Sequence, residues 1–185
     1  RRLRTMAGDT QVTLALSRAA GWAALVIGAA FAIHNVNGAW IEPRYLGFAS
    51  YEDYADLDKL REASRALPWL ASGLGHVASG FAMVLVALGG WALCRARTPA
   101  TALVMAAAGL LSAAGFLLLG LRHVIGRQAL FLLTEANPDM TDAAYLATSL
   151  ARIWFNGLAQ VGLGAFAVLL SWSGLRTGTW PRSFC

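Results

Sequence analysis

The stretch ALPWLASGLGHVASGFAMVLVALGGWALC, residues 66–94, contains no Asp, Glu, Lys or Arg along its whole length. A helix rises about 1.5 Å per residue, so this stretch is long enough to cross the roughly 30 Å of hydrocarbon in a bilayer. Three further stretches also lack charged residues and are also long enough, namely 19–41, 98–121 and 153–175. The sequence therefore predicts four membrane-spanning segments.

The overall composition supports a membrane protein, with 57% hydrophobic and 14% charged residues. Lipid offers no hydrogen-bond partners to the backbone, so a spanning segment must be a helix or part of a closed barrel. Strict apolar and polar alternation is missing, and Ala, Leu and Gly dominate the uncharged stretches, which favours closely packed helices. We predict an all-α fold, an integral membrane four-helix transmembrane bundle with spans at about 15–38, 67–94, 98–122 and 148–175.

The spans leave room for one membrane domain, residues 1–185, with outer loops at about 39–66 and 123–147. The first outer loop carries mixed charges at helical spacing, which predicts an extra amphipathic helix at the membrane surface. Ser50 would cap this helix, and a solvated connector is the alternative. The apolar side of the helix would consist of Tyr45, Phe48, Tyr51, Tyr54, Leu57 and Leu60.

The basic residues indicate how the chain is oriented. The chain has a formal net charge of +5, but Lys and Arg flank the hydrophobic stretches and form no continuous face, which argues against nucleic acid. The short turn with Arg95 and Arg97 weighs most in the positive-inside rule, so we expect both termini in the cytoplasm. The expected location is a bacterial cytoplasmic (inner) membrane.

Polar residues gather towards the outer half of the predicted spans. His34 and His76 lie within roughly 5 Å of each other in depth, as helix rise predicts. Arg152, Asn156 and Gln160 follow one face of the fourth span at intervals of four residues. Near the end of the third span lie Arg122, His123 and Arg127, with His123 about 10 Å nearer the surface by the same arithmetic.

Polar groups within a bilayer usually face the interior of the protein, where partners or a cavity satisfy them. In one interpretation, His34 and His76 form hydrogen bonds with Asn35, Asn156, Gln160 or backbone carbonyls and help the helices to recognise each other. In a second, the two imidazoles are metal ligands that hold one b-type haem from opposite sides. Arg122, Arg127 or Arg152 would then pair with the haem propionates.

A third interpretation is a quinone, or a chlorin pigment whose magnesium a histidine would ligate. Trp69, Phe81, Trp154 and Phe155 would line its apolar cavity. The fragment HVASG, residues 76–80, is distantly similar to the His-Arg-x-Ser-Gly pattern of the membrane subunits of succinate dehydrogenase, with Val77 in place of the arginine. In that family the pattern contributes to quinone binding, so the resemblance implies a quinone near His76.

Motifs for hydrolysis or phosphoryl transfer are missing from the sequence. We therefore expect a chain that is not catalytic alone, an accessory subunit of a membrane-embedded assembly. It would hold a b-type haem or quinone near the outer face for electron transfer. The alternative is a cofactor-free structural subunit that packs against other membrane subunits, with the outer loops docking a periplasmic partner.

Overall fold

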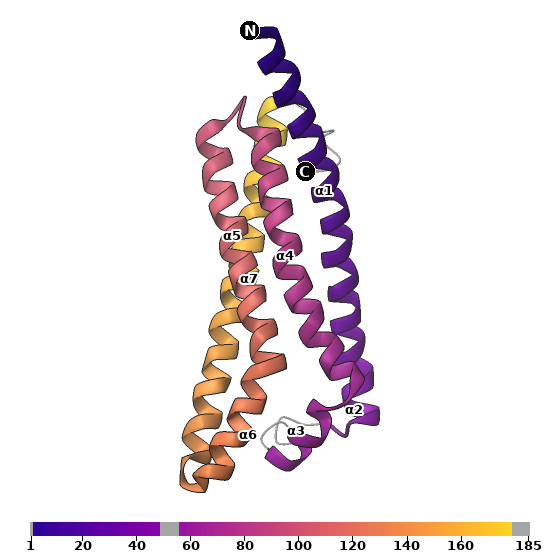
Figure 1. Ribbon diagram of the computed structural model, residues 1–185, viewed down its shortest axis with the longest axis vertical. Coiled ribbons are helices and arrows are strands. Elements are labelled where there is room, and N and C mark those ends of the chain that lie inside the picture. The colour runs from indigo at the N-terminus through magenta and orange to yellow at the C-terminus, as the bar shows by residue number, and fades with distance from the viewer. Residues whose placement is uncertain (1, 49–55, 179–185) are drawn as a thin grey trace.

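The structure is a computed structural model that describes residues 2–48 and 56–178, with side chains described from Thr10 onward. Within these ranges the chain forms helices and no strand (Figure 1). Its first helical stretch runs from α1 (Arg2–Val36) through the π-helical segment η1 (Asn37–Ile41) into α2 (Glu42–Tyr45). The rest comprises α3 (Leu57–Ser64), α4 (Leu67–Cys94), α5 (Pro99–Leu121), the π-helical η3 (Arg122–Gly126), α6 (Arg127–Ala136), the 3₁₀ turn η4 (Pro138–Met140) and α7 (Thr141–Thr177).

Four helical stretches are long and apolar enough to cross a membrane, which indicates an integral membrane protein. They are Thr10–Tyr45, Leu67–Cys94, Pro99–Ala136 and Pro138–Thr177. Three of them extend beyond the predicted spans, and the predicted outer loop 123–147 is mostly helical. The third stretch continues through Gly126, because a single glycine does not end a helix. It ends at Ala136, because Pro138 disfavours a helical conformation of the residue before it, and Asn137 is extended with φ −148° and ψ 88°.

The four long helices pack mainly against their neighbours in the chain. α4 contacts both α1 and α5, and α5 contacts both α4 and α7. In the described part of the chain, α1 makes no extensive contact with α7: α1 packs on α4, and α7 packs on α5 (Figure 1). The helices therefore leave an open side between α1 and α7.

Small residues bring α5 and α7 into backbone contact. A Cβ atom built on Gly162 of α7 would lie 2.6 Å from the backbone nitrogen of Ser112 and 2.7 Å from the carbonyl oxygen of Ala108. The hydroxyl of Ser112 donates a buried hydrogen bond of 2.8 Å to the carbonyl oxygen of Ala159. Between lipid-exposed helices such packing and hydrogen bonding replace the hydrophobic driving force that water provides.

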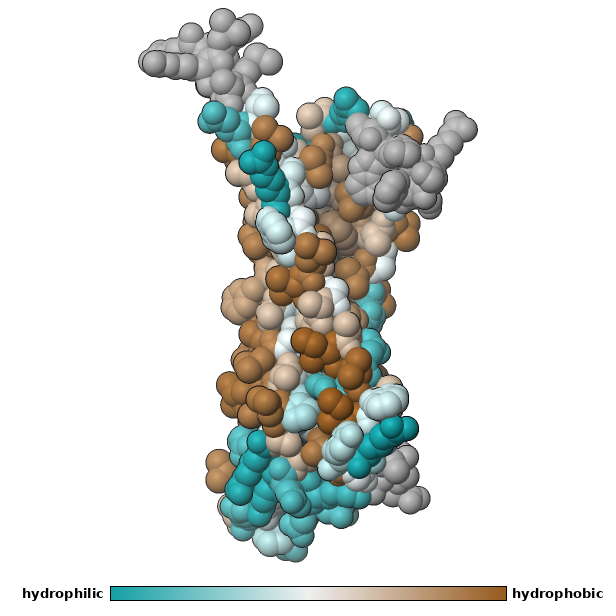
Figure 2. All heavy atoms as spheres, turned by 90° about the vertical axis from the view of Figure 1, so that its right-hand side faces the viewer, coloured by the Kyte–Doolittle hydropathy of each residue, from teal (hydrophilic) through white to brown (hydrophobic). Residues whose placement is uncertain are grey.

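One end of the molecule, which we call the polar end, carries α2, α3 and α6 and is lowest in Figures 1 and 2. A largely hydrophobic band covers the middle of the face in Figure 2, and hydrophilic side chains gather below it.

Asp56 caps α3 by accepting hydrogen bonds from the backbone of Asp58 and Lys59. A helix thus lies in the first predicted outer loop, but its cap is Asp56; Ser50, Tyr51 and Tyr54 lie outside the described residues.

The contact between α5 and α7 predicts that Gly162→Ala destabilises the protein by about 1–3 kcal/mol, because the new methyl group meets backbone atoms that cannot rotate away. Unfolding of the purified protein by titration with denaturing detergent, followed by circular dichroism, measures this loss.

Gly164→Ala is the matched control on the same helix, since a Cβ atom there meets nothing within 4 Å. Equal stability of the two variants would contradict the close backbone contact.

Candidate functional site

Three histidine side chains from three helical segments converge near the polar end. The ring centroids of His34 on α1 and His76 on α4 lie 4.6 Å apart, with 57° between the ring planes. His123 on η3 lies 5.6 Å from His76 by the same measure. The three imidazoles therefore form one cluster with His76 at its centre.

His123 lies closer to His76 than the helix rise predicts, so that depth estimate is wrong. Side chains on a helix point back towards its N-terminus, which for α5 and η3 is the interior of the membrane. The Nδ1 atom of His123 lies 3.2 Å from the carbonyl oxygen of Leu119, one turn earlier. The ring consequently sits deeper than its Cα position suggests.

A pocket of about 600 Å³ lies against the histidine cluster, and we call it the histidine pocket. Its walls come from α1, α4, α7 and the joined α5, η3 and α6, so it occupies the open side between α1 and α7. Pockets of roughly 300–1,000 Å³ suit small molecules. Seven of the eight predicted site residues line it: His34, His76, His123, Arg127, Arg152, Asn156 and Gln160.

The aromatic wall of the histidine pocket differs from the prediction. Phe81 and Trp154 are 65% and 75% exposed and do not line it, and neither does Phe155. Trp69 does line it, together with Phe31. Hydropathy does not reveal which face of a uniformly apolar helix turns inward, and this is why the prediction failed for Phe81 and Trp154.

Two ring nitrogens in the cluster are buried without a protein partner. They are Nδ1 of His34 and Nε2 of His76, neither of which has a hydrogen-bond partner among the described residues. A buried polar atom left unsatisfied costs about 1–3 kcal/mol. A ligand with a hydrogen-bonding group would recover this energy, and an imidazole nitrogen can donate or accept according to its tautomer.

Arg122 lines a second, neighbouring pocket of about 330 Å³, which we call the arginine pocket. Its Nε donates a hydrogen bond of 2.8 Å to the carbonyl oxygen of Thr148 on α7. Arg127 and Arg152 line both pockets and so connect them. The guanidinium of Arg127 stacks over the Trp69 ring at 3.7 Å, which orients the charged group.

The distance between the His34 and His76 rings tests whether the predicted haem fits between them. If metal–nitrogen bonds are about 2 Å, as for imidazole on zinc, two histidines on opposite sides of a haem have ring centroids about 6 Å apart with the macrocycle between them. The 4.6 Å between His34 and His76 leaves no such layer, so a haem between these two rings does not fit. Among the described residues, no group of three or more His, Cys, Asp or Glu is arranged to hold a metal ion.

Comparisons with known proteins found no matching family model, no matching curated protein and no matching solved structure. The function is therefore inferred from the residues of the two pockets.

Asn37, which the sequence analysis did not single out, links η1 to α4 beside the site. Its side chain is buried, and its Nδ2 donates hydrogen bonds of 2.7 Å to the carbonyl oxygen of Pro68 and 2.9 Å to the hydroxyl of Ser72. Asn37 is the first residue of η1 and follows His34 of α1 by three residues, a spacing that puts both on one face of this continuous helical stretch. The same spacing in the sequence would have indicated that this face turns towards α4.

Asn37→Ala should lower the free energy of unfolding by about 1–3 kcal/mol, because it removes two hydrogen bonds between α1 and α4. Asn35→Ala is the control, since among the described residues the exposed Asn35 amide bonds only to the Phe31 carbonyl of its own helix. Detergent-induced unfolding of both variants tests the assignment, and a larger loss for Asn35→Ala would refute it.

Proposed function

We propose that the chain is an accessory subunit of a membrane-embedded assembly and that its histidine pocket holds the head group of a quinone. The observation that carries the proposal is the pair of unsatisfied ring nitrogens on His34 and His76 at a pocket between α1 and α7. A quinone carbonyl accepts hydrogen bonds, and imidazole nitrogens can donate them.

The shape and position of the pocket support a membrane-soluble ligand. α1 and α7 make no extensive contact in the described chain, so the pocket can be entered from the side rather than only from water. Phe31 and Trp69 supply apolar surface for a flat ring, while Asn156 and Gln160 add amide groups on the α7 side. A mostly apolar pocket with a few polar groups is typical of small-molecule sites.

The proposed role is electron transfer together with a partner subunit. Reduction of a quinone to a quinol takes two electrons and two protons; the partner would supply the electrons, and the histidines would help to pass the protons. The partner would dock at the polar end, where α3 would lie at the membrane surface as an amphipathic helix. With both termini in the cytoplasm, this end faces the periplasm of a bacterial inner membrane.

The competing function is that of a cofactor-free structural subunit, whose helices would pack against other membrane subunits. The contact between His34 and His76 favours it, because rings 4.6 Å apart already pack on each other without a ligand. The two functions differ in whether the purified protein retains or takes up a quinone.

His76→Ala should lower the affinity for quinone about tenfold, because one hydrogen bond to the carbonyl is worth about 1–1.5 kcal/mol. Quinone extracted from the purified full chain, and quinone added back to it, are measured by chromatography and by the ultraviolet change on reduction.

Leu74→Ala is the control, since Leu74 is exposed on the same helix and lies outside the pocket. Absence of saturable quinone binding would sink the proposal and leave the structural function. A visible spectrum with and without dithionite is recorded in parallel, and a haem or chlorin band that His76→Ala abolishes would also overturn it.

A further inference from the structure

The arginine pocket has a lining of unusual charge. Three guanidinium groups line it, from Arg122, Arg127 and Arg152, beside the hydroxyl groups of Tyr145, Thr148 and Ser149. In the described part of the chain, no carboxylate joins this lining. Arg122 and Arg152 carry like charges that repel each other, and an anion bound between these two would relieve this repulsion.

Arg122 is already positioned to donate to such an anion. The hydrogen bond from its Nε to Thr148 fixes the guanidinium between the end of α5 and α7. Its Nη1 atom is buried and has no hydrogen-bond partner among the described residues. This nitrogen is therefore a fixed hydrogen-bond donor without an acceptor. A buried donor without an acceptor costs free energy, and a ligand that accepts the bond would recover it.

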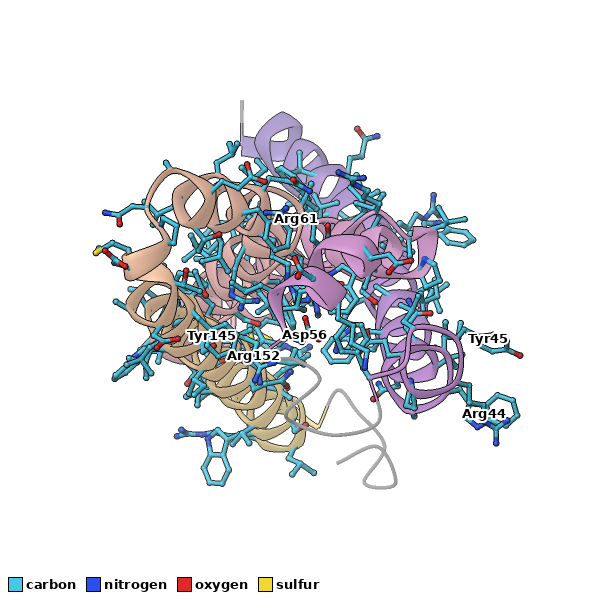
Figure 3. All side chains as sticks on the ribbon, turned by 90° about the horizontal axis from the view of Figure 1, so that it is seen from below. Arg44, Tyr45, Asp56, Arg61, Tyr145 and Arg152 are labelled. Carbon is cyan, nitrogen blue, oxygen red and sulfur yellow. The ribbon has the colours of Figure 1, made fainter. Side chains whose placement is uncertain are left out.

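Arg152 approaches the same space from α7. Seen from the polar end, Tyr145 and Arg152 lie towards the middle of the molecule, whereas Arg44 and Tyr45 point away from it at the edge (Figure 3). Planar guanidinium groups bind phosphate and carboxylate oxygens through paired hydrogen bonds. The arginines of the arginine pocket thus resemble a binding site for an oxyanion more than a set of scattered surface charges.

We propose that the arginine pocket binds a phosphate group, such as that of an anionic phospholipid. Leu60, Leu130 and Phe131 add apolar surface to the pocket, which suits a phosphate attached to hydrocarbon. The pocket also lies where the uncharged stretches 98–121 and 153–175 end, since Arg122 and Arg152 are the next residues, and such boundaries are where lipid head groups are expected. Free inorganic phosphate shares the same chemistry and is distinguished by experiment.

The test uses the purified, delipidated full chain in neutral detergent with two probes, phosphatidylglycerol and inorganic phosphate. Native mass spectrometry counts retained lipid, and a thermal-shift titration gives the affinity for each probe. Arg122→Gln should weaken binding about tenfold or more, since a hydrogen bond to a charged group is lost. Binding of phosphatidylglycerol but not phosphate identifies the lipid as the source, and binding of phosphate alone identifies the free anion; both support the site.

Arg44→Gln is the matched control, because it removes the same charge at the same end of the molecule from a side chain outside the pocket. Equal weakening in Arg44→Gln and Arg122→Gln would show general surface attraction and overturn the proposal, as would the absence of binding to either probe. If Arg122→Gln does not fold, as judged by circular dichroism, Arg152→Gln replaces it. Arg152 is exposed, and its substitution should also weaken binding; because Arg152 lines both pockets, His76→Ala then distinguishes the two sites.

This inference is independent of the proposed quinone. Arg122 lines only the arginine pocket, and His76 lines only the histidine pocket. Arg122→Gln should therefore leave quinone content unchanged, while His76→Ala should leave the affinity for phosphate or phosphatidylglycerol unchanged. Loss of phosphate binding in His76→Ala to the same degree as in Arg122→Gln would contradict a separate site.

Discussion

The close backbone contact between α5 and α7 holds α7 against the central helices. Where helices meet lipid, association depends on packing and on hydrogen bonds, because lipid tails are as apolar as the side chains. Gly162 lets α7 approach the backbone of α5, and the Ser112 hydroxyl bonds to the carbonyl of Ala159 at the same level. α1 packs on α4, where the Asn37 amide, just after α1, donates a hydrogen bond to the hydroxyl of Ser72.

The opening between α1 and α7 then has a chemical consequence. In a closed arrangement the polar side chains of α1, α4 and α7 would find partners across the interior. Here the buried Nδ1 of His34 and Nε2 of His76 have none among the described residues, although both lie beside a cavity. An unsatisfied imidazole next to ligand-sized space points to binding more strongly than either feature alone, because each polar atom there retains a cost that a ligand can remove.

The sequence predicted the relative depth of His34 and His76, but it did not predict which apolar side chains face the cavity. Helix rise predicted that His34 and His76 lie at one level, and their rings are in contact. In helices that are apolar on every side, hydropathy does not show which face turns inward. Phe81 was therefore expected to line the cavity beside Trp69, whereas Phe31 lines it with Trp69. The position of His123 depended on its side-chain direction, which spacing along the chain does not contain.

The π-helical segment η3 explains why two arginines five residues apart share one pocket. In a regular α-helix, with 3.6 residues per turn, side chains five positions apart differ by about 140° around the axis, so Arg122 and Arg127 would face different neighbours. A π-helical turn bonds residue i to residue i+5 and so brings such a pair towards the same side. Both arginines then line the arginine pocket, while His123 next to Arg122 faces the histidine pocket. A local change in helix winding, invisible to hydropathy, thus produces two adjoining sites of different chemistry from one short segment.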